Sequence, residues 1–157
     1  MLTIGSRAPA FSLPAGGGPG KLASLADYAG KKTVVVYFYP RDDTTGCTIE
    51  SCSFRDAYED FTAAGAEVIG ISADDVASHE RFSQKHRLNF VLASDPGGKT
   101  AEAYGVEKSM LGLLPGRATF VIDREGVIRD AFSSQLRLKT HVERALELVR
   151  RLEKQPG

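Results

Sequence analysis

The 157-residue sequence predicts one α/β domain, spanning residues 1–157, with a mixed central sheet flanked by helices. Two observations predict this class. Apolar, β-branched runs alternate along the chain with segments of helical periodicity, an order typical of parallel strands covered by helices. Towards the C-terminus, two such runs follow each other across a short turn, which predicts an antiparallel hairpin. The expected order of elements is β-α-β-α-β-β-α.

The N-terminal quarter of the chain contains the strand expected at the centre of the sheet. Phe11-Ser-Leu13 predicts a short edge strand, and the turn-rich loop Gly16–Gly20 follows it. Ser24–Tyr28 predicts a capped helical turn that ends at Gly30. Thr33–Tyr39 is β-branched and aromatic without polar alternation after its first residue, which predicts a central strand buried on both faces.

The rest of the chain alternates between helix and strand. Apolar residues recur at roughly helical spacing from Cys47 to Ala64, so a helix is expected there, ended by Gly65. Asp123–Gly126 is a turn signal that fits a hairpin. The other expected elements are strands at Glu67–Ser72, Phe90–Leu92, Ala118–Ile122 and Val127–Phe132, and helices at Ala77–Lys85, Thr100–Tyr104 and Leu138–Leu152.

Composition excludes several classes of function. Twenty basic and twenty acidic side chains give zero formal net charge, so no field attracts nucleic acid or an anionic membrane. The longest apolar run is too short to span a bilayer, and the N-terminus lacks the pattern of a secretory signal. Two cysteines do not make a disulfide scaffold, so we expect a cytoplasmic protein whose thiols are kept reduced.

A cysteine at the expected start of a helix has the largest chemical consequence in this sequence. Cys47 follows the polar loop Pro40–Thr44, close to unpaired backbone N–H groups and the positive end of the helix dipole. Both favour the thiolate, which is the nucleophilic form of cysteine. The alternative is an inert buried thiol, since free cysteine is often buried. Cys52, five residues later, is the chain's other cysteine.

These residues resemble a known family. Pro40, Thr44 and Cys47 match the Pro-x-x-x-Thr-x-x-Cys motif of peroxiredoxins, and Arg117 matches the position of the family's active-site arginine. The resemblance to the Q-type branch, also called bacterioferritin comigratory proteins, extends from Gly5 to the last helix and implies a thioredoxin-like fold. Further matching residues are Tyr37-Phe-Tyr-Pro40, Gly46-Cys-Thr48, Glu50, Cys52 and Phe54-Arg-Asp56.

The resemblance implies a role for each site residue. Cys47 is the peroxidatic cysteine, whose thiolate attacks a peroxide and becomes a sulfenic acid. Thr44 supplies a hydroxyl, Arg117 a planar cation for both thiolate and peroxide, and Pro40 shields the thiolate from water. Without the motif, Thr44 is equally well explained as a helix N-cap and Arg117 as a solvated loop arginine.

Cys52 is, by the same resemblance, the resolving cysteine that forms a disulfide with Cys47. Residues five apart in an intact α-helix have Cα atoms about 8.6 Å apart. A disulfide requires less than about 7 Å. The first turns of the helix must therefore unwind if the two cysteines pair. The alternative is that Cys52 is a small side chain facing the core.

The family resemblance also implies substrates and partners. It implies a thiol-dependent peroxidase that reduces hydrogen peroxide and small alkyl hydroperoxides and is recycled by thioredoxin or a similar dithiol protein. No metal, flavin or haem cofactor is implied, and a monomer is expected, with a dimer as the alternative. A general thiol–disulfide oxidoreductase is a rival interpretation, but those proteins favour Cys-x-x-Cys, which this chain lacks. A redox-sensing module is a third.

The remaining polar candidates predict no further site. His79, His86 and His141 are far apart in sequence and without ligand spacing, so we expect them on the surface. Glu50 and Arg55 are interpreted either as a pair beside the site or as solvated charges on the helix.

Overall fold

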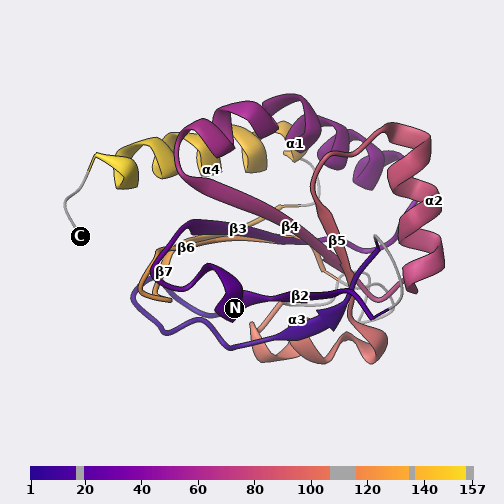
Figure 1. Cartoon of the computed structure of the whole chain (residues 1–157), viewed down its shortest axis with the longest axis horizontal. Helices are drawn as coiled ribbons and strands as arrows, with labels where there is room; N and C mark the ends of the chain where they lie inside the picture. Colours follow the sequence, from indigo (N-terminus) through magenta and orange to yellow (C-terminus); the bar gives the residue numbers. More distant parts are fainter. Residues whose placement is uncertain (17–19, 107–115, 135–136, 155–157) are drawn as a thin grey trace.

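A five-stranded mixed sheet forms the centre of the computed structural model, which describes residues 1–16, 20–106, 116–134 and 137–154 (Figure 1). The strand order is β5-β4-β3-β6-β7. β3 pairs in parallel with β4, and β4 with β5, whereas β6 is antiparallel to both β3 and β7. The strands are β3 (Thr33–Phe38), β4 (Ala66–Ser72), β5 (Val91–Ser94), β6 (Ala118–Ile122) and β7 (Ile128–Ser133).

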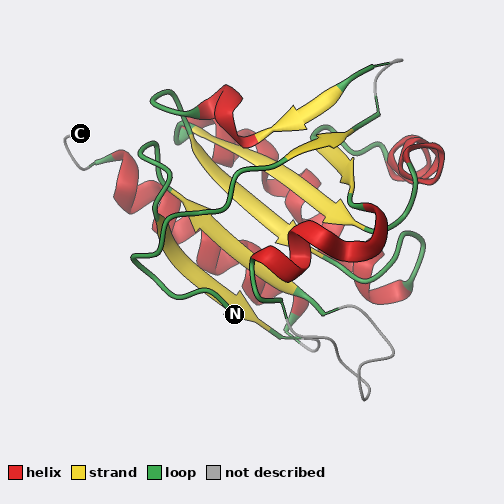
Figure 2. Ribbon diagram, turned by 90° about the horizontal axis from the view of Figure 1, so that it is seen from below, coloured by secondary structure: helices red, strands yellow, loops and turns green. Residues whose placement is uncertain are grey.

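Helices cover both faces of this sheet. Helices α1 and α4 lie side by side on one face, and α3 lies on the other (Figure 1). Figure 2 shows the sheet from the side that carries α3. The helices are α1 (Thr45–Ala63), α2 (Val76–His86), α3 (Lys99–Ala103) and α4 (Leu138–Glu153), with 3-10 turns η1 (Leu25–Tyr28) and η2 (Pro96–Gly98). The predicted mixed α/β class is confirmed.

The central strand β3 separates two apolar cores. Val35, Tyr37 and Tyr39 pack among residues of α1, α2 and α4 on one face. Val34, Val36 and Phe38 pack on the other face, with Tyr104 and Phe120. Every residue of β3 is buried, as expected for a strand covered on both sides.

The N-terminal strand differs from its expected position. β1 (Ser12–Pro14) pairs antiparallel with β2 (Leu22–Ser24) in a separate two-stranded sheet, and β2 was not predicted. The turn-rich loop predicted at Gly16–Gly20 falls between these strands, and its residues 17–19 lie outside the described part of the chain. Ser24 does not cap the following turn η1 with its side chain, because its hydroxyl bonds to Ser12 Oγ at 2.7 Å.

The other elements lie within about two residues of their predicted ends, which is the usual uncertainty of helix and strand boundaries. The hairpin between β6 and β7 is confirmed: Asp123 accepts hydrogen bonds from the backbone of Glu125 and Val127, and Gly126 has a positive φ of 84°. The strand expected at Phe90–Leu92 is Val91–Ser94 instead. Phe90 precedes it and packs edge-on to Tyr37, with ring centroids 6.0 Å apart.

A glycine in β4 helps to position the first turns of α1. A Cβ at Gly70 would lie 2.7 Å from Tyr37 Cζ and 2.8 Å from a methyl of Leu92, so only glycine leaves room for the Tyr37 ring. The Tyr37 hydroxyl shares a hydrogen bond of 2.8 Å with Ser51 Oγ, and its ring stacks on Phe54 at 4.5 Å. Both partners lie on α1, so the sheet fixes the helix that carries both cysteines.

Candidate active site

The loop between β3 and α1 reverses the chain and leads into the cysteine-bearing turn. Asp43 adopts a left-handed conformation with φ of 62°, which aspartate tolerates better than most residues. Thr44 occupies the N-cap position with extended backbone angles, and its carbonyl accepts the bond from Thr48 N at 2.9 Å. The Thr44 hydroxyl does not cap the helix; it donates to Arg41 O at 3.1 Å. The N-cap interpretation therefore holds for the Thr44 backbone and fails for its side chain.

Cys47 and Arg117 meet inside the protein, although 70 residues separate them. Cys47 lies in the first turn of α1 and Arg117 directly precedes β6. Arg117 Nη2 donates to Cys47 Sγ at 3.2 Å, and the two residues are 4% and 0% exposed. The alternative of a solvated loop arginine is therefore wrong. A hydrogen bond from a guanidinium is charge-assisted, and exclusion of water strengthens such an interaction.

Gly46 allows this close approach. A Cβ at Gly46 would lie 3.2 Å from Arg117 Nη2 and 3.6 Å from Leu138 Cδ1, closer to the arginine than most Cβ contacts. A Cβ at this position would therefore require the guanidinium to give way by a few tenths of an ångström. The sequence motif contains this glycine, and its steric role becomes visible only in the structure.

Glu50 completes a buried triad with Arg117 and Cys47. Arg117 Nη1 donates to Glu50 Oε1 at 2.5 Å while the other terminal nitrogen reaches the sulfur. Glu50 is 0% exposed, so its interpretation as a solvated helix charge is wrong, and Arg55 pairs with Asp56 instead. The signal was present in the sequence: Glu50 lies three residues after Cys47, on the same face of the helix.

Burial shifts the titration of the acidic and basic groups behind the cysteine. It raises the pKa of Glu50 to about 7, although the charge and hydrogen bond of Arg117 act in the opposite direction. Burial also lowers the pKa of His141, on α4, to about 4. The prediction of a surface His141 is wrong, because its ring is 1% exposed. Its place among the apolar residues of α4, three after Leu138, could have indicated burial.

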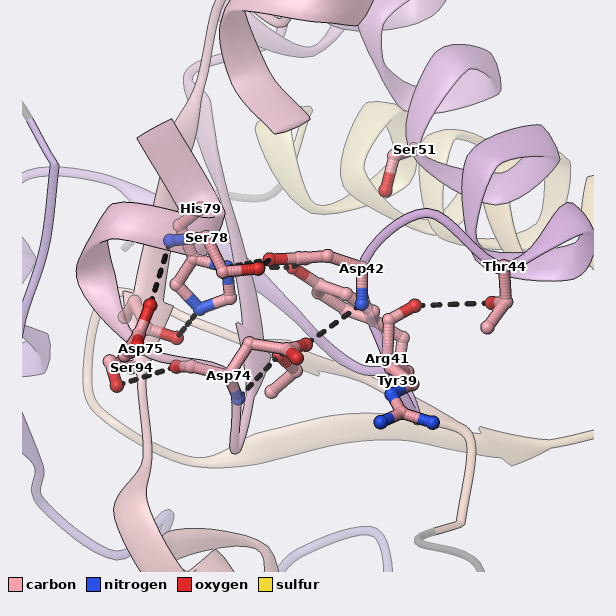
Figure 3. A network of polar contacts seen from close by, with 12 residues as sticks. Tyr39, Arg41, Asp42, Thr44, Ser51, Asp74, Asp75, Ser78, His79 and Ser94 are labelled. Carbon is pink, nitrogen blue, oxygen red and sulfur yellow. Dashed lines mark hydrogen bonds and ion pairs between the residues drawn. The ribbon is translucent and has the colours of Figure 1, made fainter. Parts of the chain in front are cut away.

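A second polar network anchors the loop before the cysteine (Figure 3). Asp42 accepts hydrogen bonds from Tyr39 at 2.6 Å and from Ser78 at 2.8 Å, and its Oδ2 lies 2.8 Å from His79 Nδ1. Burial favours protonation of Asp42, but the bonds from His79, Tyr39 and Ser78 outweigh it and lower the pKa of Asp42. His79 is 1% exposed, so its predicted surface position is wrong.

Three side chains of this network have the chemistry of metal ligands. Asp42, Asp74 and His79 place possible ligand atoms within 4.8 Å of one another. Each of them already takes part in hydrogen bonds: Asp74 accepts from Asp42 N and Ser72 Oγ, and His79 Nε2 lies 2.9 Å from Ala93 O. We therefore assign these side chains to holding the loop against α2 and β4.

The remaining predicted residues flank the triad. Pro40 is half-buried at the start of the loop, two residues after the end of β3. Cys52 is half-buried on α1, and both cysteines are free thiols in an uninterrupted helix. The ideal helical separation of about 8.6 Å between their Cα atoms therefore applies, and it exceeds what a disulfide allows.

Comparisons with known proteins agree with these observations. Residues 4–131 match the model of the AhpC/TSA family. "Peroxiredoxin Q, chloroplastic" of Suaeda salsa is 48% identical over 148 residues, which cover 94% of this chain and 68% of that protein. The structure of peroxidoxin BcpB from Mycobacterium tuberculosis has a TM-score of 0.87 at 34% identity, covering 97% of this chain and 99% of the other. A structure of the Xanthomonas campestris bacterioferritin comigratory protein, which concerns the alkyl peroxide reduction activity of that protein, has a TM-score of 0.82 at 34% identity over 92% of both chains.

Proposed function

This chain belongs to the AhpC/TSA family of peroxiredoxins and is a thiol-dependent peroxidase, and we propose that Cys47 is the residue that attacks the peroxide. The thioredoxin-like fold and the Q-type assignment predicted from the sequence are confirmed. One observation carries the choice of residue: Cys47 Sγ lies 3.2 Å from the guanidinium of Arg117 in a site without solvent exposure.

The proposed reaction is a displacement at oxygen. The Cys47 thiolate attacks the terminal oxygen of a peroxide, so that an S–O bond forms and the O–O bond breaks. The sulfur is oxidised to a sulfenic acid, and the departing oxygen takes up a proton to become water or an alcohol. Arg117 supports this step because its donors can hold the peroxide and stabilise charge on the departing oxygen. We assign Thr44 a hydroxyl contact to the peroxide and Pro40 the shielding of the sulfur.

The substrates we propose are hydrogen peroxide and small alkyl hydroperoxides. The related Xanthomonas campestris protein supports the second class, because its structure concerns alkyl peroxide reduction. The burial of Cys47 supports small substrates, since the thiol is 0% exposed.

We further propose that Cys52 resolves the sulfenic acid by forming a disulfide with Cys47. The proximity of the two thiols in sequence supports this pairing, and helix geometry sets its condition: the start of α1 must unwind. Unwinding also separates Cys47 from Arg117 and brings the sulfur out of its buried position. A thioredoxin-type dithiol protein then returns both cysteines to thiols.

Replacing Cys52 by serine should separate the first step from recycling. We expect Cys52→Ser to consume one equivalent of peroxide at the wild-type rate, because Cys47 and Arg117 are unchanged. Turnover with thioredoxin should be poor, and Cys47 should over-oxidise to the sulfinic acid, because no internal thiol traps the sulfenic acid. The measurement is single-turnover and steady-state peroxide consumption. Wild-type steady-state turnover would remove Cys52 from the mechanism.

Oxidation should loosen the first turns of α1. We expect faster amide hydrogen exchange in the oxidised protein from Gly46 onward, because the disulfide cannot form while those helical hydrogen bonds persist. Phe54 is fully buried and stacked on Tyr37 at 4.5 Å, so the exchange should return to its reduced-state rate near this residue. Exchange in α4 serves as the internal control. Equal protection of residues 46–53 in both redox forms would contradict the coupled unwinding.

Cellular location and oligomeric state stay predictions. The relative from Suaeda salsa is named as chloroplastic, and the cytoplasmic location expected here is a proposal from composition alone. In the part of the chain that the structure describes, we find no helix with the length and apolar character required to cross a bilayer.

A further inference from the structure

Glu50 has one oxygen whose position is not explained by Arg117. Oε1 accepts from the guanidinium, but Oε2 is buried and has no hydrogen-bond partner among the described residues. A nitrogen of His141, Nδ1, lies 3.5 Å from this oxygen. Burying a carboxylate oxygen without a hydrogen-bond donor costs free energy. The surroundings of Oε2 therefore indicate whether Glu50 is protonated.

The contacts of His141 fix the proton on its ring. Nε2 lies 2.9 Å from Ser134 O, a carbonyl that can only accept, so Nε2 carries the hydrogen. Nδ1 lies 2.7 Å from the Thr119 hydroxyl, which can donate. Arg117 and Arg144 place positive charge near the ring, and together with burial they oppose a second proton on it. His141 is therefore a neutral imidazole, and its unprotonated Nδ1 lies 3.5 Å from Glu50 Oε2.

An ionised Glu50 would not fit this arrangement. Its Oε2 and His141 Nδ1 would then face each other with lone pairs only. A proton on Oε2 supplies the missing donor and converts the contact into an O–H···N hydrogen bond. The charge balance agrees: Arg117 is one cation beside two acids, Glu50 and Cys47, which compete for it in a buried site.

We propose that Glu50 and His141 hold one proton between them behind Cys47, and that His141 is a positioning residue that keeps Glu50 uncharged. The positive charge of Arg117 is then left to the thiolate and the peroxide, while the neutral carboxyl still accepts from Arg117 Nη1 and fixes its orientation. Ionisation of Glu50 neutralises Arg117 and slows the reaction. This inference rests on the proposed role of Cys47.

The groups that face Glu50 come from four elements. They are Cys47 on α1, Tyr37 on β3, Arg117 before β6 and His141 on α4, with Arg144 acting on the histidine. Tyr37 is neutral, because burial raises its pKa well above the usual value. Arg144 is engaged by Asp130 through two hydrogen bonds, of 2.6 and 2.7 Å. Among these described groups, Glu50 is the carboxyl that competes with the Cys47 thiol for the charge of Arg117.

The first test does not depend on activity. The folded protein holds the Glu50 proton up to a pKa of about 7, whereas the unfolded chain loses it near the ordinary value of 4.5. The stabilisation is present at acidic pH and is lost as pH rises between these values. The free energy of unfolding of the wild type minus that of Glu50→Gln should therefore fall across this window. The infrared band of a protonated carboxyl, missing from Glu50→Gln, should disappear over the same window.

The second test measures the second-order rate constant with hydrogen peroxide. Glu50→Gln keeps an oxygen for Arg117 and a donor for His141, but it cannot ionise. The ratio of wild-type to variant rate constants should be close to one below the Glu50 pKa of about 7. Above this pKa the ratio should fall about tenfold. A tenfold fall is the effect expected if the charges of Glu50 and Cys47 are coupled by about one pKa unit. Glu67→Gln is the matched control, since Glu67 accepts from Tyr58 at 2.7 Å at another place in the sheet.

Two further variants separate positioning from structure. His141→Phe keeps a ring but removes the acceptor of the Glu50 proton, so the fall in the rate constant should move to lower pH. Thr119→Val removes the hydroxyl that competes for Nδ1, so the fall should move to higher pH. A merely structural role for His141 would lower the rate at all pH values without moving the transition.

The outcomes distinguish this proposal from the proposed function. If the wild type consumes peroxide but the stability difference and the rate ratio are both flat across this pH range, Glu50 does not exchange a proton and the proposal is overturned. If no peroxide is consumed, the proposed function fails, and the stability difference alone still decides whether the proton is there.

Discussion

Cys47→Ser should lose peroxide consumption completely. A serine hydroxyl is not ionised at neutral pH, so Arg117 would face a neutral group that cannot displace an oxygen from a peroxide. Serine is close to cysteine in size, and the buried contact with Arg117 Nη2, now 3.2 Å from sulfur, has an oxygen acceptor in the variant. The fold should therefore persist. The measurement is peroxide consumption with protein in excess, which requires no reductant.

Cys52→Ser is the matched control for this variant. Each of the two variants retains one of the two cysteines. Loss of the first reaction in Cys47→Ser, together with its retention in Cys52→Ser, assigns the nucleophile. A Cys47→Ser protein that keeps about a tenth of the wild-type rate would show that the nucleophile lies elsewhere.

Arg117→Ala should produce the second largest loss. The guanidinium contacts the sulfur at 3.2 Å and is held by Glu50 on its other nitrogen, so it is fixed before the peroxide arrives. Loss of one positioned donor of this kind costs roughly 3–4 kcal/mol in the transition state, or about 10²–10³ in rate. The measurement is the second-order rate constant of Cys47 with hydrogen peroxide. An unchanged constant would place Arg117 outside the site.

Two controls separate charge from geometry and from folding. Arg117→Lys keeps the positive charge, but its single ammonium nitrogen replaces the two guanidinium nitrogens that contact Cys47 and Glu50. Its rate constant should therefore lie between those of Arg117→Ala and the wild type. The double variant Glu50→Gln/Arg117→Ala leaves no buried unpaired charge, which protects the fold. Arg129→Ala is the matched surface control, since Arg129 pairs with Asp123 on the β6–β7 hairpin.

The sequence predicted the parts of this site that follow from local rules. A strand that ends in a proline, a polar loop and a helix start placed Cys47 correctly, and helix periodicity placed Cys52 on the same helix. The family motif led to Arg117, and the structure places this arginine beside Cys47 across 70 residues of chain. No local pattern connects those two positions, because they are brought together by the long-range antiparallel pairing of β6 with β3.

The buried polar residues were the main errors. His79 and His141 were expected at the surface, and a solvated charge was one of the two interpretations of Glu50, since charged and imidazole side chains usually stay in water. Each one is buried because a partner distant in sequence satisfies it: Arg117 for Glu50, Asp42 for His79, and Thr119 for His141. Such pairs arise from tertiary packing, which a single sequence does not display. The two-stranded sheet of β1 and β2 was missed in part for the same reason.

The central claim is that Cys47 takes the oxygen of the peroxide and passes the oxidation to Cys52. The chain offers a direct test, because trypsin cleavage after Arg41 and Arg55 gives one peptide with both cysteines. After one equivalent of hydrogen peroxide, mass spectrometry of the alkylated digest should show this peptide unalkylated and lighter by two hydrogens than its reduced form. In Cys52→Ser, the same peptide should carry oxygen on Cys47. A wild-type peptide in which Cys47 remains a free, alkylated thiol would contradict the account.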